Sequence, residues 1–326
     1  MVWRTPATFR RKARSSQAAG VRGGRAWSTR SSRRSPATCR SSTAAGSSEA
    51  LAVVADRGEA ALAGRSVVIS GAAGGIGSAL ARRFGRAGAR VGLLDLDAAS
   101  LAALAGELEA GGVEVLALRC DVTSLEDCRA AVGQVVVAWG GVDVLVANAG
   151  ITHLSFFRDT DVEVIRRVME VNFFGAVNCT KAALDSLRER RGHIVAISSV
   201  AGFAPLATRC GYSASKHAMH GFFDSLRGEL RSDGVGVTLF CPFFVRTEIG
   251  QSALGGDGGA PRMPRTETGT PADPEDVAEA VLRAVLKGRR LVAFPGAGRL
   301  AYVLSRFLPG LYERIMVRRI VPGSGS

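Results

Sequence analysis

The sequence predicts an α/β fold: a single domain built on a doubly wound parallel β-sheet of about seven strands, with helices on both faces. Two observations predict it. Short runs rich in β-branched residues alternate with helix-length segments from Arg65 onward, and a glycine-rich turn joins the first run to the first helix. A chain of 326 residues that is 47% hydrophobic can also bury one large core.

The predicted elements alternate along the chain. The expected strands are Ser66–Ser70, Arg90–Leu94, Glu114–Arg119, Val142–Val146, His193–Ser198, Val235–Phe240 and Leu291–Phe294. The expected helices are Gly75–Ala87, Ala98–Ala110, Leu125–Trp139, Val162–Arg188, Ser213–Arg231 and Pro274–Leu286. Because crossovers between parallel strands are right-handed, these units should wind into one sheet covered on both faces.

The net charge of +13 is concentrated at the N-terminal end. Residues 1–48 contain ten Arg and one Lys with no acidic residue, whereas the rest of the chain is nearly neutral. This segment has no hydrophobic period, so we expect a disordered basic extension. An extension without function, a targeting peptide and a binding arm all fit its composition. Nucleic acid is not an expected partner, because the folded part is not basic and the extension lacks interleaved aromatic residues.

Cysteine usage and hydropathy indicate where the protein resides. The six cysteines form no C-x-x-C pair and lie in segments predicted to be core, which favours reduced thiols in an intracellular protein. No apolar run reaches 18 residues, and no secretory signal follows the basic segment. We therefore expect a cytoplasmic protein, with peripheral membrane contact and organelle targeting by residues 1–48 as open alternatives.

The turn Ser70-Gly71-Ala72-Ala73-Gly74-Gly75-Ile76-Gly77 follows a strand and opens a helix. Backbone N–H groups and the helix dipole at such a place can face a pyrophosphate, as in a Rossmann-type fold. Its glycine spacing differs from G-x-G-x-x-G, so a plain tight turn is the alternative.

Asp95 lies 24 residues after Gly71, at the end of the second predicted strand. A carboxylate there can accept hydrogen bonds from the adenosine ribose hydroxyls. It favours NAD over NADP, because a 2′-phosphate would meet a like charge and neither Gly74 nor Leu96 supplies a cation. Asp97 is close enough to be the alternative carboxylate.

Further motifs follow in order: Cys120-Asp121-Val122 after the third strand, Ala147-Asn148-Ala149-Gly150 after the fourth, then Asn172, Ser199, Tyr212 and Lys216. With the glycine turn, they make residues 64–297 resemble the short-chain dehydrogenase/reductase family. The resemblance implies a catalytic tetrad of Asn172, Ser199, Tyr212 and Lys216, and no metal. It implies that the cofactor is bound by Ser70, Gly71, Gly75, Ile76, Gly77, Asp95, Asp121, Val122, Asn148, Ala149, Gly150, Tyr212, Lys216, Pro242, Val245 and Thr247.

Tyr212 and Lys216 are four residues apart, so they share one face of a helix. A free phenol, with a pKa of about 10, is a poor base at neutral pH. A nearby ammonium, joined by the positive oxidised nicotinamide, should stabilise the phenolate and lower that pKa. Tyr212 would then exchange protons with the substrate oxygen. In the family, the lysine also hydrogen-bonds the nicotinamide ribose.

Ser199 follows the fifth strand, thirteen residues before Tyr212, and its hydroxyl can hydrogen-bond the substrate oxygen as charge develops. Ser198 is the competitor, but strand alternation should point it to the opposite face. Asn172, within the long predicted helix, resembles the family residue that holds a water in the proton relay.

One position departs from the family pattern. The family has Pro-Gly after the sixth strand, whereas this chain has Pro242-Phe243. We expect the bulky side chain to reshape the nicotinamide or substrate side of the site. Other apolar residues near the chemistry predict a pocket for a hydrophobic alcohol or ketone. The candidate phenylalanines, each of which can equally be core, are Phe156, Phe157, Phe203, Phe243 and Phe244.

Residues 298–326 form a predicted basic, amphipathic helical tail that is interrupted at Pro309. It could cover the substrate pocket, pack in an oligomer, or contact a membrane surface through residues 298–320. Upstream of the predicted catalytic domain, residues 49–63 are expected to form a linker or short helix. The family resemblance and the two long helices Val162–Arg188 and Ser213–Arg231 imply a homodimer or homotetramer.

The predicted activity is hydride transfer between NAD(H) and a hydrophobic secondary alcohol or ketone, such as a steroid, retinoid or lipid, with Tyr212 as general acid or base. A reductase of 3-oxoacyl thioesters is an alternative within the same family. An alternative of another class is a catalytically inactive Rossmann-fold binding protein.

Overall fold

The structure is a computed structural model, and it describes residues 62–250, 252–263 and 270–320. All of these residues belong to the unit Ser47–Ser326. The predicted basic extension, all but the last two residues of the predicted segment 49–63, and residues 321–326 lie outside the described residues.

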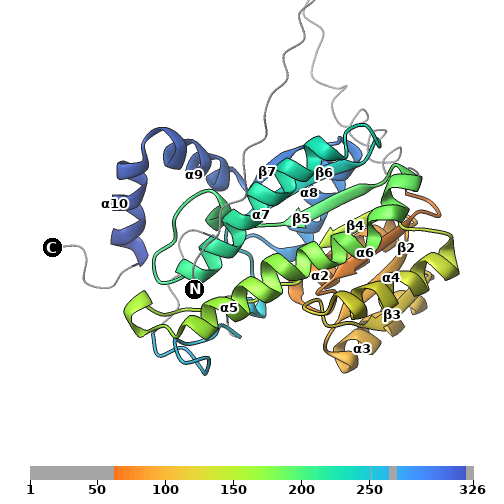
Figure 1. The fold of residues 1–326 in the computed structure, drawn as a ribbon, viewed down its shortest axis with the longest axis horizontal. Coiled ribbons are helices and arrows are strands. Elements are labelled where there is room, and N and C mark those ends of the chain that lie inside the picture. The colour runs from red at the N-terminus through yellow and green to blue at the C-terminus, as the bar shows by residue number, and fades with distance from the viewer. Residues whose placement is uncertain (1–61, 251, 264–269, 321–326) are drawn as a thin grey trace, which may run out of the picture. The chain divides into compact units, whose positions relative to one another are not determined.

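Seven parallel strands form one sheet in the order β3-β2-β1-β4-β5-β6-β7 (Figure 1). They are β1 (Ser66–Ser70), β2 (Arg90–Asp95), β3 (Val115–Arg119), β4 (Val144–Ala147), β5 (His193–Ile197), β6 (Gly236–Pro242) and β7 (Leu291–Phe294). The strand order reverses between β1 and β4, which pair in parallel with Val67 opposite Val144. The carboxyl ends of these two strands therefore border the crevice in which a doubly wound sheet binds ligands.

Helices cover both faces of the sheet, which confirms the predicted fold class. The helices α2 (Gly75–Arg86), α3 (Ala98–Ala110) and α8 (Pro274–Leu286) pack on one face, and α4 (Leu125–Trp139), α6 (Gly175–Arg190) and α7 (Cys210–Glu229) on the other. Strand alternation divides the two cores: Val67 and Ile69 of β1 belong to the first, and Val68 to the second. Because both faces are buried, the strands are almost continuously apolar.

The predicted helix Val162–Arg188 is not continuous. It consists of α5 (Val162–Met169), a π-helical turn (Glu170–Phe174) and α6. Asn172 lies in the π-helical turn, where its buried side chain hydrogen-bonds the backbone of Ile151. A π turn of this kind often marks a functional position. The hydrophobic period could not reveal it, because the interruption depends on a contact with a residue 21 positions away.

Other boundaries differ from prediction by one to three residues, and the start of β4 and the start of α7 are the largest shifts at strand and helix starts. β4 begins at Val144 rather than Val142, because the Val142 N–H donates to Ser186 Oγ at 2.7 Å instead of joining the sheet. α7 begins at Cys210, three residues earlier than predicted, and this places Tyr212 in its first turn. Short 3-10 turns lie at Phe157–Asp159, Val200–Gly202 and Glu248–Gly250.

The chain ends in two helices, α9 (Gly296–Phe307) and α10 (Pro309–Ile320), which follow β7 (Figure 1). They form the helical tail that was predicted with an interruption at Pro309, but the first helix begins at Gly296 rather than at residue 298, and Pro309 opens the second helix as expected for a proline in the first turn. In the described part of the chain, no helix combines the length and apolar character needed to cross a membrane.

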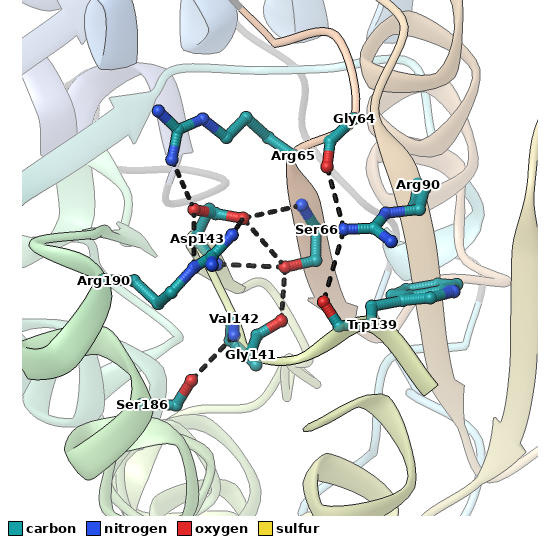
Figure 2. Close-up of polar contacts among 10 residues, drawn as sticks. All are labelled: Gly64, Arg65, Ser66, Arg90, Trp139, Gly141, Val142, Asp143, Ser186 and Arg190. Atoms are coloured by element: carbon teal, nitrogen blue, oxygen red, sulfur yellow. Dashed lines mark hydrogen bonds and ion pairs between the residues drawn. The ribbon is translucent and has the colours of Figure 1, made fainter. Parts of the chain in front are cut away.

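A buried carboxylate, that of Asp143, joins β1, β4 and α6 at the amino ends of the two strands (Figure 2). Asp143 accepts hydrogen bonds from Ser66 N and Ser66 Oγ at 3.0 Å, and pairs with Arg65 at 2.8 Å and Arg190 at 3.1 Å. Burial works to raise the pKa of Asp143, but Arg190, Ser66 and Arg65 outweigh it and lower the pKa to about 2. The carboxylate therefore fixes the ends of two central strands.

Asp143→Asn should lower the free energy of unfolding by roughly 2–3 kcal/mol at neutral pH, because two arginines lose a buried partner. Since the pKa is depressed, this contribution is present above about pH 4 and is lost as the pH falls towards about 2. Urea midpoints of wild type and variant should converge over that range. Glu163→Gln, which removes an exposed partner of Arg166, is the control and should change little. Equal midpoints for Asp143→Asn and wild type at pH 7 would contradict this role.

Candidate active site

A cavity of about 570 Å³ opens at the carboxyl ends of β1, β4, β5 and β6. Its walls come from segments far apart in the sequence, which only the sheet order brings together. Of the predicted site residues, the cavity is lined by Gly71, Gly75, Ile76, Gly77, Asp95, Asp121, Val122, Asn148, Ala149, Gly150, Ser199, Tyr212, Lys216, Pro242, Val245 and Thr247. The cavity, called the cleft below, therefore contains all but two of the predicted site residues.

The glycine turn approaches the neighbouring backbone too closely for side chains. Gly71 has a φ of +64°, and a Cβ there would lie 2.7 Å from Ala149 Cα. A Cβ on Gly77 would lie 2.0 Å from Gly71 O, and one on Gly75 would lie 2.8 Å from Thr247 Cγ2. The N-cap Gly74 carries no side chain to cap α2, so the first N–H groups of that helix are free to meet an anion at the cleft.

Ser70 and Asn148 hold the glycine turn in place. Ser70 Oγ accepts hydrogen bonds from Asn148 N at 3.0 Å and Ala149 N at 3.2 Å, and Asn148 Nδ2 donates to the carbonyls of Ser70 and Gly71. Ser70 is buried and lies behind the cleft rather than on its wall. The structure therefore gives this predicted cofactor residue a bracing position.

Asp95 and Asp97 both border the cleft, but their hydrogen bonds differ. Asp97 is the N-cap of α3 and accepts from Ala99 N and Ser100 N. Asp95 stands at the end of β2, where Oδ2 accepts from Ala73 N of the glycine turn at 2.9 Å. Each carboxylate oxygen has two lone pairs, so Asp95 keeps acceptor capacity towards the cleft. The hydrogen bond to the glycine turn favours Asp95 over Asp97, and its role as the ribose-binding carboxylate stays a prediction.

The turn after β3 closes the far end of the cleft. Asp121 accepts from Thr123 N at 2.9 Å, and Asn178 of α6 donates to the Val122 carbonyl at 3.0 Å. These bonds hold Asp121 and Val122 on the cleft wall, where a flat ring can lie against them.

Tyr212 and Lys216 lie one turn apart on α7 and face the cleft together. Lys216 is buried, and its Nζ donates to the Ile197 carbonyl at 2.9 Å and lies 5.8 Å from the centre of the Tyr212 ring. The ammonium is therefore held at the end of β5, beside the phenol ring.

The electrostatics of this pair reflect its burial. Burial raises the pKa of Tyr212, and the Ser199 hydroxyl and the Arg209 charge oppose that shift. Burial also lowers the pKa of Lys216 to about 8. In the chain without a cofactor, loss of water therefore dominates the pKa of both groups, and the lowering of the phenol pKa by Lys216 together with the oxidised nicotinamide stays a prediction.

Ser199 is the second residue after β5, and its Oγ accepts from Ala201 N at 3.1 Å while it lines the cleft beside Tyr212. Ser198 also lines the cleft, but its Oγ bonds the ring of His220 at 3.0 Å. The two hydroxyls thus differ in their partners, while the expected turn of Ser198 to the opposite face does not remove it from the cleft wall.

Asn172 does not line the cleft but lies directly behind it. Its Oδ1 accepts from Ile151 N at 2.8 Å, and its Nδ2 donates to the Ile151 carbonyl and to Ser215 Oγ. It also stands close to Gly150, where an added Cβ would lie 3.3 Å from Asn172 Oδ1 and 3.6 Å from Lys216 Nζ. Asn172 thus joins the π-helical turn, the end of β4 and the lysine.

The substrate side differs from the predicted aromatic pocket. Phe243 and Phe244 line it, with their rings 4.9 Å apart, but none of residues 153–157, all of them described, reaches it. Phe157 is exposed and Phe203 packs on Tyr302 of α9. The rings of Phe157 and Phe203 thus point away from the cleft. The presence of phenylalanines near the motifs in the sequence could not show the direction of their side chains.

Sequence reasoning missed several residues of the wall. Arg167 of α5 and Arg209 before α7 reach it, as does Tyr312 of α10, one hundred residues beyond Tyr212. The helical spacing of the tail was the available signal for Tyr312, but it did not specify which face would pack inward. Further lining residues that the sequence did not single out are Leu96, Ser100 and Val200, whereas Leu206 and Ile249 come from the segments 202–210 and 243–270 that were candidate pocket elements.

The cleft fits a nicotinamide dinucleotide. At one end Asp95 offers a carboxylate, in the middle the glycine turn leaves no side chains over the start of α2, and at the other end Lys216 and Tyr212 stand together. These groups match ribose hydroxyls, a pyrophosphate, and a reactive ring with its own ribose, in that order.

Comparison with known proteins agrees with this geometry. The profile of the family described as short chain dehydrogenase matches residues 65–255. The chain belongs to the short-chain dehydrogenase family. It is therefore an oxidoreductase of the NAD(P)-dependent class.

Among relatives of this short-chain dehydrogenase is the dehydrogenase/reductase SDR family member 7B of Danio rerio, with 39% identity over 80% of this chain and 87% of the relative. The protein of that name from Bos taurus is 38% identical over 78% of this chain and 80% of its own. A solved structure of a short chain dehydrogenase/reductase from Burkholderia phymatum, in complex with NAD, has 27% identity and a TM-score of 0.68, covering 79% of this chain and 96% of that chain. A solved structure of an alcohol dehydrogenase from Thermococcus sibiricus, complexed with 5-hydroxy-NADP, has 29% identity and a TM-score of 0.61. The match covers 70% of this chain and 94% of that chain.

Lys216→Met should stabilise the unliganded short-chain dehydrogenase by roughly 1–2 kcal/mol at pH 7. At pH 7, below the pKa of about 8 that Lys216 has in the folded protein, the wild type is destabilised by a fully charged buried ammonium. Loss of the hydrogen bond to Ile197 in the variant offsets only part of the stability gained by removing that charge. The gain should shrink as the pH rises towards 10, where the wild-type lysine becomes neutral. Urea unfolding at pH 7 and 10 measures it, with exposed Lys181→Met as the control. A destabilised Lys216→Met protein at pH 7 would refute this account.

Proposed function

We propose that this chain catalyses hydride transfer between NAD(H) and a hydrophobic secondary alcohol or ketone, with Tyr212 as the general acid or base. The observation that carries the proposal is the convergence of Tyr212, Lys216 and Ser199 at one end of a cleft whose other end holds Asp95. A bound nicotinamide supplies or accepts the hydride. The chain provides the proton, the orientation of the substrate oxygen and the exclusion of water.

Each residue near the chemistry has a distinct role in this proposal. Ser199 donates a hydrogen bond to the substrate oxygen as negative charge develops on it. Tyr212 donates its proton to that oxygen during reduction and takes it back during oxidation. Lys216, already anchored at Ile197, adds positive charge beside the phenol and can reach the cofactor ribose. Asn172 is a positioning residue that fixes the backbone at Ile151.

The raised pKa of Tyr212 has a consequence for the proton step. In the chain alone the phenol is protonated at neutral pH, so it is ready to donate to a ketone oxygen. For oxidation, the phenolate must gain stabilisation beyond what Lys216 provides in the unliganded chain. A positively charged oxidised cofactor in the same cleft supplies it.

The preference for NAD over NADP rests on Asp95, which stands where a 2′-phosphate would enter. The bond from Ala73 N fixes its orientation. The preference for a hydrophobic substrate rests on Phe243, Phe244, Leu206 and Ile249 in the opposite wall. A 3-oxoacyl thioester is a second candidate, favoured by Arg167 and Arg209 near the cleft mouth, since both can meet an acidic carrier group.

We also propose residues 64–297 as the catalytic domain, with α9 and α10 as an appended cover. Assembly into a homodimer or homotetramer through α5, α6 and α7, and residence in the cytoplasm, belong to the same proposal.

Tyr212→Phe should reduce turnover by roughly 10²–10⁴-fold, because the substrate oxygen loses its proton donor. A panel of alcohols and ketones assayed with NAD(H) and NADP(H) by nicotinamide absorbance first identifies a substrate. Binding of NADH, followed by its fluorescence, should be unchanged in the variant. Tyr302→Phe, on α9 beside Phe203, is the matched control and should retain turnover. A fully active Tyr212→Phe protein would exclude the proposed mechanism.

Asp95→Asn should shift the ratio of kcat/KM for NAD over NADP towards NADP by roughly tenfold or more. The amide keeps an oxygen for Ala73 N but removes the charge that repels a 2′-phosphate. Steady-state kinetics with both cofactors measures the ratio. Asp97→Asn is the matched control, because asparagine preserves the N-cap of α3. A ratio that moves equally in both variants would show that Asp95 does not select the cofactor.

A further inference from the structure

The outward side of α9 and α10 is apolar. Five of the fourteen large hydrophobic side chains that are exposed in the described part of the chain lie on these two helices, a sixth, Leu308, lies between them, and Phe307 is 75% exposed. Within each helix three or four residues separate them, so they share one exposed side of α9 and one exposed side of α10. This outer apolar face consists of Leu300, Val303, Phe307, Leu308, Leu311 and Ile315.

The opposite side of the same helices is anchored over the cleft. Tyr302 packs edge-on against Phe203, with ring centres 4.9 Å apart. Met316 is buried, and its Sδ accepts from Ala207 N at 3.3 Å. Tyr312 packs against the same small apolar cluster as Phe243, formed by Val200, Ala204 and Ala301, and lines the cleft itself. Both helices are thus packed on their inner side against the substrate side of the cleft. Their outer apolar face is therefore exposed on helices that already have packing partners.

Basic side chains flank the outer apolar face. The helices carry one acidic residue, Glu313, and every arginine on them is exposed, with no ion pair to any described residue. These arginines are Arg299, Arg306, Arg314, Arg318 and Arg319. An exposed apolar stripe bordered by arginines is the pattern of a helix that lies in the surface of an anionic membrane, where each arginine contributes about 1 kcal/mol.

Charge argues against the other occupants of this face. A second copy would bring the same arginines against one another, and like charges across an interface are repulsive. Residues 1–48 contain eleven basic residues and no acidic one, so they would be repelled as well. A bilayer that contains anionic lipid can bury the apolar side chains and at the same time attract the arginines.

We propose that α9 and α10 dock the enzyme on an anionic phospholipid bilayer and that its hydrophobic substrate enters the cleft from the bilayer, past Tyr312. α10 carries part of the outer apolar face and, through Tyr312, part of the cleft wall, so docking of this face brings the cleft close to the lipid surface. The wall on the other side of Tyr312 is apolar at Ala204, Pro205 and Leu206, which suits the passage of a lipid-like chain. The entry route rests on the proposed function, whereas the docking does not.

The docking is tested by flotation of the full chain with phosphatidylcholine vesicles, with and without phosphatidylserine. Wild type should float with the anionic vesicles. Phe307→Ser/Leu311→Ser should bind them roughly tenfold more weakly, as should Arg314→Gln/Arg318→Gln. Controls of the same chemistry elsewhere are Phe157→Ser, at an exposed phenylalanine, and Arg262→Gln, at an exposed arginine; both should float like wild type.

A local probe separates this face from the basic N-terminal segment, which can itself attract anionic vesicles. Tryptophan fluorescence of the Phe307→Trp protein should be quenched by brominated lipid beyond the quenching of wild type, whereas Phe157→Trp should show no extra quenching. Flotation that is unaffected by both double variants, with no extra quenching at position 307, would overturn the proposal. A vesicle-independent change from dimer to monomer in Phe307→Ser/Leu311→Ser would assign the face to a second copy instead.

The entry route has its own measurement. Phe307→Ser/Leu311→Ser should slow turnover of a long-chain ketone presented in vesicles but leave turnover of a short, water-soluble ketone unchanged. Equal turnover of both would refute entry from the bilayer. Tyr212→Phe should lose turnover if the proposed function holds, but it should still float with the vesicles. A failure of the proposed chemistry and a failure of the docking are therefore distinguishable.

Discussion

The turn after β1 approaches the end of β4 so closely that no side chain fits between them, and the cleft exists because of this contact. A Cβ on Gly71 would meet Ala149 at 2.7 Å, and Asn148 reaches back to hydrogen-bond the carbonyls on either side of the approach. The contact sets the distance between the start of α2 and the strand end that leads to Gly150. It thereby spaces the glycine turn from Lys216, which lies close to Gly150 on the far wall.

The chemistry depends on charge that is held away from water. Lys216 is buried beside Tyr212 with a single carbonyl as its close oxygen partner, and burial moves the pKa values of the two groups in opposite directions, both towards their neutral forms. The pKa values of such a buried pair change strongly when a further charge enters the cleft, because the low dielectric constant around them screens that charge only weakly. The unliganded site is therefore built at a cost in stability, as is common where function needs a perturbed group.

The position that departs from the family pattern connects the cleft to the end of the chain. Phe243 stands where the family has glycine, and it packs against a small apolar cluster that includes Ala301 of α9 and is also contacted by Tyr312 of α10. A glycine there would offer no surface for these helices to cover. The bulky residue thus links the substrate wall to an element whose other side is apolar and basic, which gives this short-chain dehydrogenase a surface that the common fold does not require.

The sequence by itself determined the sheet, the order of its motifs and the pairing of Tyr212 with Lys216, because strand alternation, glycine turns and helical spacing are local properties. Only the tertiary structure decided which side chains reach the cleft. It turned Phe157 outward, placed Ser70 behind the glycine turn, interrupted the long helix at Asn172 and brought Tyr312 to the substrate wall. Each of these depends on a partner distant in sequence. Burial likewise set the direction of the pKa shifts, since the loss of water around a charge is a property of the whole fold.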